Sequence, residues 1–306
     1  MKKILVAGGA GFLGSHLTEL LVSREHDVTV VDDFSSGRRT NLSNVESKVK
    51  LIHSNICDLN YDRPIHAVIN LASRASRNEW ETFPVDVALA NSIGSDKLIK
   101  LSIKNHARYV YASSSEIYGD PEVIPTPESY VGRVDSLGPR SPYVESKRFG
   151  ETLVSSYVKQ HALDGIILRL FNTYGPRMRA GDLYGRVVDR FVKQALKADP
   201  LTIYGDGKQT RAFAYVSDVV EGIAKLIEDG ISGEVYNIGS STETTIIDLA
   251  RLVIKTAESK SSLEFRPLPK DDPKRRAADI TKAEAVGWKP RVGLREGLGL
   301  MVEQTR

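Results

Sequence analysis

The sequence has little cysteine and no long hydrophobic run, and each scarcity excludes a class of protein. Its 306 residues contain one cysteine, Cys57, which excludes an internal disulfide and any zinc cluster built on cysteines. We predict a free, buried thiol in a reducing compartment. No stretch reaches about 18 uninterrupted apolar residues. The apolar start KILVA runs into glycines, so we expect neither a signal peptide nor a membrane anchor, and a cytoplasmic location.

The chain also lacks a strong excess of charge of either sign. Its 42 Lys and Arg residues and 39 Asp and Glu residues give a net charge of +3. So small an excess argues against nucleic acid as an obligate partner, which usually requires a concentrated basic stripe. We predict no metal site. There is no internal repeat and no linker long enough to separate independent domains, so one large core or two lobes are expected.

What the sequence does have is an alternation of short β-branched runs and segments of helical periodicity. This pattern predicts an α/β protein with a Rossmann-like, doubly wound parallel sheet covered by helices on both faces. After about Asn172 the pattern loosens, so we expect a first domain over 1–172, with a return segment near 213–240, and a smaller C-terminal α/β lobe over 173–306. The expected strands are 3–7, 27–31, 49–53, 66–71, 108–113 and 165–171, and expected helices include 14–23, 91–104 and 187–197.

A glycine-rich stretch, GGAGFLG (8–14), joins the first run to the first helix. Its glycines allow a tight turn that brings backbone N–H groups and a helix N-terminus against a pyrophosphate. Asp32 ends the second run, where a carboxylate accepts both ribose hydroxyls of an adenosine and repels a 2′-phosphate. NAD is therefore favoured over NADP. Arg38 and Arg39 could bind a 2′-phosphate and leave NADP as the alternative. Asp58 suits a contact to the adenine amine or a plain turn equally well.

Tyr143 and Lys147 lie four residues apart in YVESK and share one face of the helix predicted to start at Pro142. The lysine is expected to hold positive charge beside the phenol and to lower the pKa of Tyr143 toward neutrality. Tyr143 then takes a proton from a sugar hydroxyl as hydride leaves for the nicotinamide. Ser114, which follows the fifth run, is expected to bridge the substrate oxygen and the phenol. An incidental surface pair is the less favoured alternative.

Together these motifs resemble a known group of enzymes. GGAGFLG, SSSEIYG, YVESK and FNTYGPR resemble the extended short-chain dehydrogenase/reductase superfamily of nucleotide-sugar enzymes, from Lys3 to about Pro290. Within it, SEIYGDPEVIPTPESYVGRVDSLGPRSPYVESKR and PLTIYGDGKQTRAFAYVSD are most similar to UDP-glucuronate decarboxylases. The resemblance implies an NAD-dependent enzyme that forms UDP-xylose by C4 oxidation, loss of CO2 and C4 re-reduction. The implied cofactor contacts are Gly8, Gly11, Phe12, Leu13, Gly14, Asp32, Asp58, Leu71, Tyr143 and Lys147.

In this superfamily the position of Glu116 follows the reaction. Simple 4-epimerases commonly lack a carboxylate there, 4,6-dehydratases carry Asp-Glu, and decarboxylases carry Ser-Glu, as in Ser115-Glu116. Loss of CO2 from a 4-keto uronate leaves an enolate, which Tyr143 and Ser114 are expected to hold. A carboxylate near C5 suits proton handling or orientation of the ring, and in a site cleared of water its pKa is expected to rise. The alternative is that Glu116 only stabilises the turn between the strand and the next helix.

The resemblance also implies a clamp for the nucleotide diphosphate, whose negative charges attract arginines. Arg211 and Arg276 match diphosphate contacts, and in one decarboxylase branch the residue matching Arg276 assists decarboxylation. Tyr204 is placed to cover the base. The implied catalytic residues are Ser114, Ser115, Glu116, Tyr143, Lys147 and Arg276, and the implied substrate contacts are Asn172, Arg186, Tyr204, Arg211 and Arg276.

One segment departs from the decarboxylase pattern. Where those enzymes carry prolines, LASRASRNEWE (71–81) has Arg74 and Arg77, which suit a uronate carboxylate, another acidic sugar or plain surface charge. The alternative enzyme is a UDP-sugar 4-epimerase, which needs Tyr143, Lys147 and NAD but not Glu116. A dehydratase is less favoured because the acidic pair is Ser-Glu. A non-catalytic NAD-binding protein is disfavoured because both the tyrosine and the lysine are present.

The resemblance finally implies a homodimer through two long helices, at about 91–104 and 143–161, that form a four-helix bundle. The second has apolar residues at helical spacing that suit a core face as well as an interface. The expected partners are thus a UDP-sugar and a second copy of the chain, with no nucleic acid and no membrane. The apolar residues are Val144, Phe149, Leu153 and Tyr157.

Overall fold

The computed structural model describes residues 1–178, 187–268 and 273–306. Within these residues the core is a sheet of seven parallel strands in the order β11-β6-β5-β4-β1-β2-β3. The chain order reverses between β1 and β4, which is where such sheets bind ligands, beyond the carboxyl ends of the strands. The strands are β1 (Lys3–Ala7), β2 (Asp27–Asp32), β3 (Lys50–His53), β4 (Ala67–Asn70), β5 (Arg108–Ser114), β6 (Gly165–Leu170) and β11 (Val235–Ile238).

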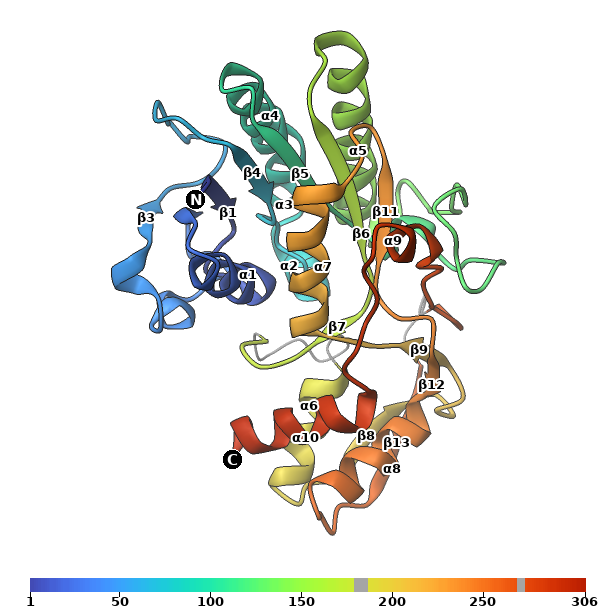
Figure 1. Cartoon of the computed structure of the whole chain (residues 1–306). Coiled ribbons are helices and arrows are strands. Elements are labelled where there is room, and N and C mark those ends of the chain that lie inside the picture. Colours follow the sequence, from blue (N-terminus) through green and yellow to red (C-terminus); the bar gives the residue numbers. More distant parts are fainter. Residues whose placement is uncertain (179–186, 269–272) are drawn as a thin grey trace.

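Helices cover both faces of this sheet (Figure 1), because the strands present apolar side chains in both directions. In β1, Ile4 and Val6 belong to the core that includes α1 (Phe12–Ser23) and α7 (Val216–Asp229). Leu5 and Ala7 belong to a second core, with α4 (Ser95–Lys104) and α5 (Ser141–His161). Burial on both faces explains why the strands read as nearly continuous apolar runs. The predicted Rossmann-like, doubly wound fold is confirmed.

The six strands expected from the sequence form within one residue of their predicted ends. The helix expected over 91–104 begins with a π-helical stretch, η3 (Ala90–Gly94), before α4. The YNIG segment lies largely in β11, which pairs with β6 at one edge of the sheet. The division into domains at residue 172 stays a prediction.

A smaller group of elements lies below the sheet in Figure 1. Helices α6 (Val187–Leu196), α8 (Ile246–Thr256) and α10 (Leu294–Thr305) pack against one another there. Three strand pairs accompany them: β8 (Leu201–Tyr204) with β13 (Leu263–Arg266), β9 (Thr210–Ala212) with β12 (Glu243–Thr245), and β7 (Thr173–Tyr174) with β10 (Ala214–Tyr215). The remaining elements are η1 (Arg39–Leu42), η2 (Glu46–Lys48), α2 (Arg77–Thr82), α3 (Pro84–Leu89), η4 (Ser115–Tyr118) and α9 (Thr281–Ala285).

Two further features concern the helices and the single cysteine. Across the described residues, every helix is too short or too polar to cross a membrane. Cys57 is a free thiol, but it is half-buried rather than buried, because it lies on the turn after β3. Partial burial still raises the pKa of this thiol.

Candidate active site

A cavity of about 600 Å³ lies at the carboxyl ends of the central strands and reaches the smaller lobe. Its wall combines the loops after β1, β4 and β5 with residues of α5, β8 and β9. The structure thus brings together chain segments that are far apart in the sequence. The predicted site residues that line the cavity are Gly8, Gly11, Phe12, Leu13, Gly14, Asp32, Leu71, Ser114, Glu116, Tyr143, Lys147, Asn172, Tyr204, Arg211 and Arg276.

Two predicted site residues are not among those that line the cavity. Asp58 is exposed on the turn after β3, where Ile56 lines the cavity, and its contact to the adenine amine stays a prediction. Ser115 is buried but does not line the wall, because the chain turns into η4 directly after Ser114. Arg186 lies outside the described residues.

The glycine-rich loop after β1 forms a cradle with no room for side chains. Gly8 has a φ of +77°, and a Cβ there would lie 2.8 Å from the backbone of Ala72. A Cβ on Gly14 would lie 2.0 Å from the carbonyl oxygen of Gly8. Gly11 is the N-cap residue of α1, and no described side chain caps this N-terminus, so its first N–H groups face the loop. This cradle fits the pyrophosphate of a dinucleotide.

Asp32 lies beside this cradle with its side chain almost completely buried. Its carboxylate accepts hydrogen bonds from the N–H groups of Ala10 (2.9 Å) and Phe34 (2.8 Å). Burial raises the pKa of Asp32, and the two hydrogen bonds oppose that rise. A Cβ on Gly37 would lie 2.8 Å from the carboxylate, so a glycine keeps the space beside it open. The carboxylate is thus positioned to accept ribose hydroxyls.

Tyr143 and Lys147 lie on the buried face of α5, which has Pro142 in its first turn. The Lys147 ammonium donates to the carbonyl of Ala112 (2.7 Å) and lies 5.7 Å from the centre of the Tyr143 ring. Burial lowers the pKa of Lys147 to about 7 and raises that of Tyr143 to about 12, while a hydrogen bond with Ser114 opposes the second shift. The expected acidification of Tyr143 is therefore wrong for the free protein, because burial disfavours the charged form of both groups.

Glu116 is held between two guanidinium groups, those of Arg276 and Arg140. The Arg140 contact measures 2.7 Å, and the Glu116 side chain is 18% exposed. Burial alone would raise the pKa of Glu116, but the positive charges of Arg276 and Arg140 outweigh it and hold the pKa at about 2. The expected rise in this pKa is therefore wrong, because both arginines stabilise the carboxylate. Glu116 is ionised at neutral pH.

Arg140 and Trp80 also line the cavity, and neither was predicted from the sequence. The Trp80 ring, in α2, stacks on the Tyr143 ring with 4.5 Å between centroids and 12° between planes. Its indole N–H donates to the carbonyl of Arg74 (3.0 Å), which anchors the ring. The sequence signal for Trp80 was an aromatic residue within 71–81, the segment that departs from the decarboxylase pattern. The only signal for Arg140 was its position two residues before Pro142.

Arg74 and Arg77 both line the cavity, yet each already contacts a carboxylate of its own segment. The Arg74 guanidinium lies 3.7 Å from Glu79 and 4.5 Å from the centre of the Phe83 ring. Arg77 donates to Glu81 (3.0 Å), one turn along α2. These contacts favour a role in ordering the segment around Trp80 over plain surface charge.

Several buried polar atoms in the cavity wall have no hydrogen-bond partner among the described residues. They include the amide nitrogen of Asn172, the hydroxyl of Ser73 and the Nε of Arg276. A buried polar atom without a partner costs about 1–3 kcal/mol, so such groups are expected where a ligand supplies the partner. Asn172 and Arg276 are predicted substrate contacts, whereas Ser73 was missed.

The far end of the cavity carries a flat, polar surface suited to a base. The Tyr204 ring lies 5.2 Å from the guanidinium of Arg190, and the Gln209 amide donates to the Tyr204 carbonyl (2.8 Å). Arg211, which is 9% exposed, donates to the carbonyl of Thr210 (2.8 Å). The cavity therefore runs from the glycine cradle, past Tyr143 and Glu116, to an aromatic and basic end.

A dinucleotide cradle that leads to a buried tyrosine and lysine on one helix face defines the short-chain dehydrogenase class. The model of the NAD dependent epimerase/dehydratase family matches residues 4–239, and the chain belongs to this family. Its cofactor is therefore NAD, as the sequence predicted.

Individual proteins of this family are similar to the chain over nearly its whole length. The chain is 43% identical to UDP-glucuronic acid decarboxylase 1 of Danio rerio over 305 residues, which cover 99% of this chain and 72% of that protein. Among solved structures it is similar to UDP-glucose 4-epimerase of Thermotoga maritima with UDP-glucose, with TM-score 0.91, 34% identity and coverage of 99% and 98%. It is also similar to UDP-glucose 4-epimerase of Thermus thermophilus with NAD, with TM-score 0.87, 31% identity and 98% of both chains covered.

Proposed function

We propose that this protein is an NAD-dependent UDP-glucuronate decarboxylase that forms UDP-xylose. The observation that carries the proposal is the Glu116 carboxylate held by Arg140 and Arg276 in the same cavity as Tyr143. A simple epimerase needs only a proton acceptor and a hydride acceptor, whereas this cluster adds fixed charge where a carboxylate must leave. The 43% identity to a decarboxylase over nearly the whole chain supports the same reaction.

The chain's own residues define how the cofactor is held. The cradle of Gly8, Gly11 and Gly14 would hold the pyrophosphate, Asp32 would hold the adenosine ribose, and Tyr143 and Lys147 would lie toward the nicotinamide end. The chemistry that NAD would supply there is reversible acceptance of the hydride from C4 of the sugar. We propose on this basis that residues 1–172 serve as the NAD domain and residues 173–306 as the sugar-nucleotide lobe.

The first chemical task is to remove the proton from the C4 hydroxyl. Tyr143 takes this proton, and Ser114 holds the sugar oxygen by a hydrogen bond. Because Tyr143 is protonated in the free protein, it must lose its own proton before it acts as the base. That proton passes to solvent, and the Lys147 ammonium, 5.7 Å from the centre of the Tyr143 ring, stabilises the phenolate while it is protonated. The Trp80 ring keeps the Tyr143 ring in one orientation.

The second task is to release CO2, after which C5 of the enolate takes a proton from a solvent water molecule. The C5–C6 bond breaks, its electrons form the enolate of the C4 ketone, and Tyr143 and Ser114 stabilise the enolate oxygen by donating hydrogen bonds. Glu116 is ionised and paired, so we assign it the role of positioning Arg276 rather than that of acid. Arg276 holds the uronate carboxylate or the diphosphate. Asn172, Arg211, Tyr204 and Arg186 are the further substrate contacts we propose.

The experiment that tests this function is proton NMR of the purified chain with NAD and UDP-glucuronate, followed over time. A parallel sample contains UDP-glucose. Loss of the uronate with formation of UDP-xylose is the expected result. An unchanged uronate beside conversion of UDP-glucose to UDP-galactose would make the protein a 4-epimerase, like the two similar solved structures.

We also propose that the protein is a homodimer and acts in the cytoplasm. Exposed apolar residues follow each other at helical spacing on α3 and η3: Val85 (65% exposed), Leu89 (41%) and Ile93 (53%). Phe149 on α5, which packs against α3, is 49% exposed. Such a row is suited to a second copy related by two-fold symmetry. Val144, which suited a core face as well as an interface, is buried in the core. Cell fractionation tests the location.

A further inference from the structure

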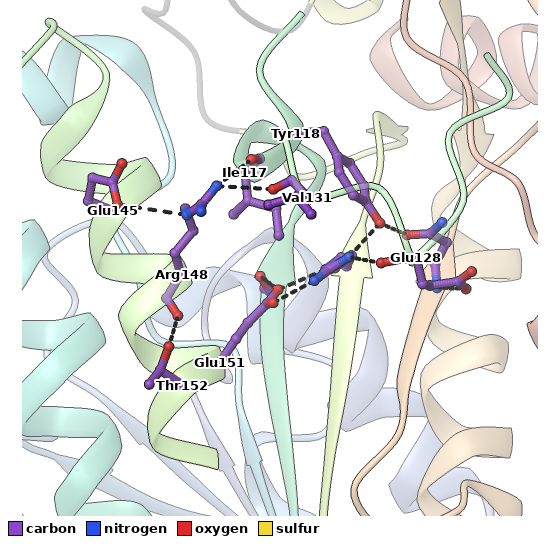
Figure 2. A network of polar contacts seen from close by, with 11 residues as sticks. Ile117, Tyr118, Glu128, Val131, Glu145, Arg148, Glu151 and Thr152 are labelled. Atoms are coloured by element: carbon purple, nitrogen blue, oxygen red, sulfur yellow. Dashed lines mark hydrogen bonds and ion pairs between the residues drawn. The ribbon is translucent and has the colours of Figure 1, made fainter. Parts of the chain in front are cut away.

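Behind the cavity lies a network of buried polar side chains, drawn in Figure 2. Its centre is Arg169 on β6. In the sheet, Arg169 is the register partner of Ser113 on β5 and of Asn237 on β11, so three polar residues form a row across three adjacent strands. Ser113 and Asn237 are buried, and the Arg169 side chain is 12% exposed.

On one side, this row holds helix α5 through Glu151 (Figure 2). Arg169 donates two hydrogen bonds to the Glu151 carboxylate, from Nε (3.0 Å) and Nη2 (2.7 Å). The Ser113 hydroxyl donates to the same carboxylate (2.5 Å). Glu151 lies four residues after Lys147 and eight after Tyr143, so these side chains share one face of the helix. The position of Glu151 therefore sets the position of both.

On the other side, the row holds the turn that carries Glu116. The Nη1 of Arg169 donates to the Tyr118 hydroxyl (2.9 Å) and to the carbonyl of Glu128 (2.7 Å). Tyr118 ends η4, two residues after Glu116, and its hydroxyl donates to Asn237 (2.8 Å). Figure 2 shows Tyr118 and Glu151 as parts of one network.

The same row reaches the segment that carries Arg276. The Asn237 side-chain amide donates to the carbonyls of Thr126 (2.9 Å) and Asp279 (3.0 Å). Asp279 follows Arg276 by three residues. Arg169, Glu151 and Tyr118 are not among the described residues that line the cavity. Any effect of these three side chains on the site must therefore pass through other groups.

We propose that Arg169 is a positioning residue that fixes the helix carrying Tyr143 and Lys147 relative to the turn carrying Ser114 and Glu116. A guanidinium suits this role because its planar fork makes two bonds to Glu151 while a third nitrogen reaches Tyr118. A lysine has the charge without the fork. Arg148 links α5 to the same turn at the surface, but its contact to the Ile117 carbonyl is long (3.5 Å). This inference rests on the proposed function, because its test measures turnover of the proposed substrate.

The test compares Arg169→Gln and Arg169→Lys with a matched control, Arg108→Gln. Arg108 makes a similar two-bond contact, to Asp164 (2.9 and 3.1 Å), at the opposite end of the same strands and away from the cavity. For Arg169→Gln we expect kcat to fall about 10- to 100-fold, with KM for the UDP-sugar changed by less than about threefold. Arg169→Lys is expected to recover the melting temperature but not kcat. Arg108→Gln is expected to keep kcat within about twofold.

Two results would overturn the proposal: a kcat close to that of the parent in folded Arg169→Gln, or full recovery of kcat in Arg169→Lys. If Arg169→Gln does not fold, Tyr118→Phe removes only the hydroxyl link, and we expect a drop of about 3- to 10-fold in kcat. An unchanged kcat in Tyr118→Phe contradicts the proposal. A parent that converts UDP-glucose rather than UDP-glucuronate refutes the decarboxylase function alone. The same variants are then compared on UDP-glucose, because both reactions begin at Tyr143.

Discussion

At the scale of single residues, the charge state of each active-site group depends on its neighbours more than on its type. Glu116 is buried, a condition that favours the neutral acid, yet its pKa is about 2 because two guanidinium groups contact it. Lys147 has one opposite charge acting on it, that of Glu151, and burial lowers its pKa to about 7. The site therefore pairs a permanently charged carboxylate with a lysine that exchanges protons at neutral pH.

Replacement of Glu116 by glutamine tests the positioning role of the carboxylate. An amide cannot neutralise Arg140 and Arg276, so we expect kcat for CO2 release to fall about 100- to 1000-fold, while UDP binds within about threefold. Folding stability should fall by about 3 kcal/mol at neutral pH, because the arginines lose a buried partner. Kinetics, calorimetric titration with UDP and thermal melts measure the three quantities.

The pH dependence of the same variant gives a second test. The folded-state pKa of Glu116 is lowered from 4.5 to about 2, so its stabilising effect is complete above 4.5 and is lost as the pH falls toward 2. The stability difference between parent and variant should shrink over that range. Glu122→Gln is the control, since Glu122 pairs with Arg133 (2.6 Å) at the surface of the same loop. Full turnover by Glu116→Gln would show that the cluster is a bystander.

Lys147→Met tests the cost of burying an ammonium group. The pKa of Lys147 is lowered from 10.5 in the unfolded chain to about 7 in the folded protein. Burial of its positive charge therefore lowers the free energy of unfolding by the full amount below pH 7, and this loss disappears as the pH rises toward 10.5. The variant should therefore exceed the parent in stability by about 2 kcal/mol near neutral pH, with a smaller gain in alkali. Lys100→Met, on the exposed side of α4, should show no such pH-dependent gain. An equal gain at every pH would contradict the lowered pKa.

The sequence predicted most of these residues but not their state. Tyr143, Lys147, Glu116 and Arg276 follow from motifs, and the structure brings all four to one cavity. Their pKa values depend on contacts made only after folding, such as that of Glu116 with Arg276, 160 residues away. No local pattern carries that information.

At the scale of elements, strands of the central sheet were predictable because burial on both faces leaves a nearly continuous apolar signal. The π-helical start at η3 was not, since its 3.6-residue pattern resembles an ordinary helix. The strand pairs of the smaller lobe were not predicted either. Strands β8 and β13 are short and separated by 58 residues, from Tyr204 to Leu263, so tertiary context decides their pairing.

The loop between β1 and α1 offers a sharp test at this scale. In Gly14→Ala the new Cβ would meet the Gly8 carbonyl at 2.0 Å, so the cradle must open. We expect NAD affinity to fall at least about tenfold and the melting temperature to drop by several degrees. Gly299→Ala is the matched control, because Gly299 lies within α10 with nothing within 4 Å of its would-be Cβ. That change should add about 0.5–1 kcal/mol of stability and leave NAD affinity unchanged.

At the scale of the whole molecule, the cavity is a product of the fold rather than of any one segment. Its wall runs from Gly8 in the first loop to Arg276 near the end of the chain, and Asn172 lies between the sheet and the smaller lobe. The network around Arg169 holds three of these segments from behind. The parts that recognise cofactor and substrate are thus placed by one continuous core.

The apolar row on α3 and η3 makes a prediction about the assembly as a whole. If Val85, Leu89, Ile93 and Phe149 meet the same residues of a second copy, the parent should sediment at twice the mass of the chain. A charge at the centre of this row, in Leu89→Glu or Ile93→Lys, would lose its hydration in the interface and should give a monomer. Ile231→Lys is the control, because Ile231 is equally exposed (63%) but lies beyond α7 on the other side of the sheet. Sedimentation velocity measures all three variants. A monomeric parent would contradict the dimer, and a dimer that survives both charges would place the interface elsewhere.

Helix α5 carries both Phe149 and the face with Tyr143 and Lys147. If contact with the partner holds this helix in position, the monomeric variants should also lose part of their kcat.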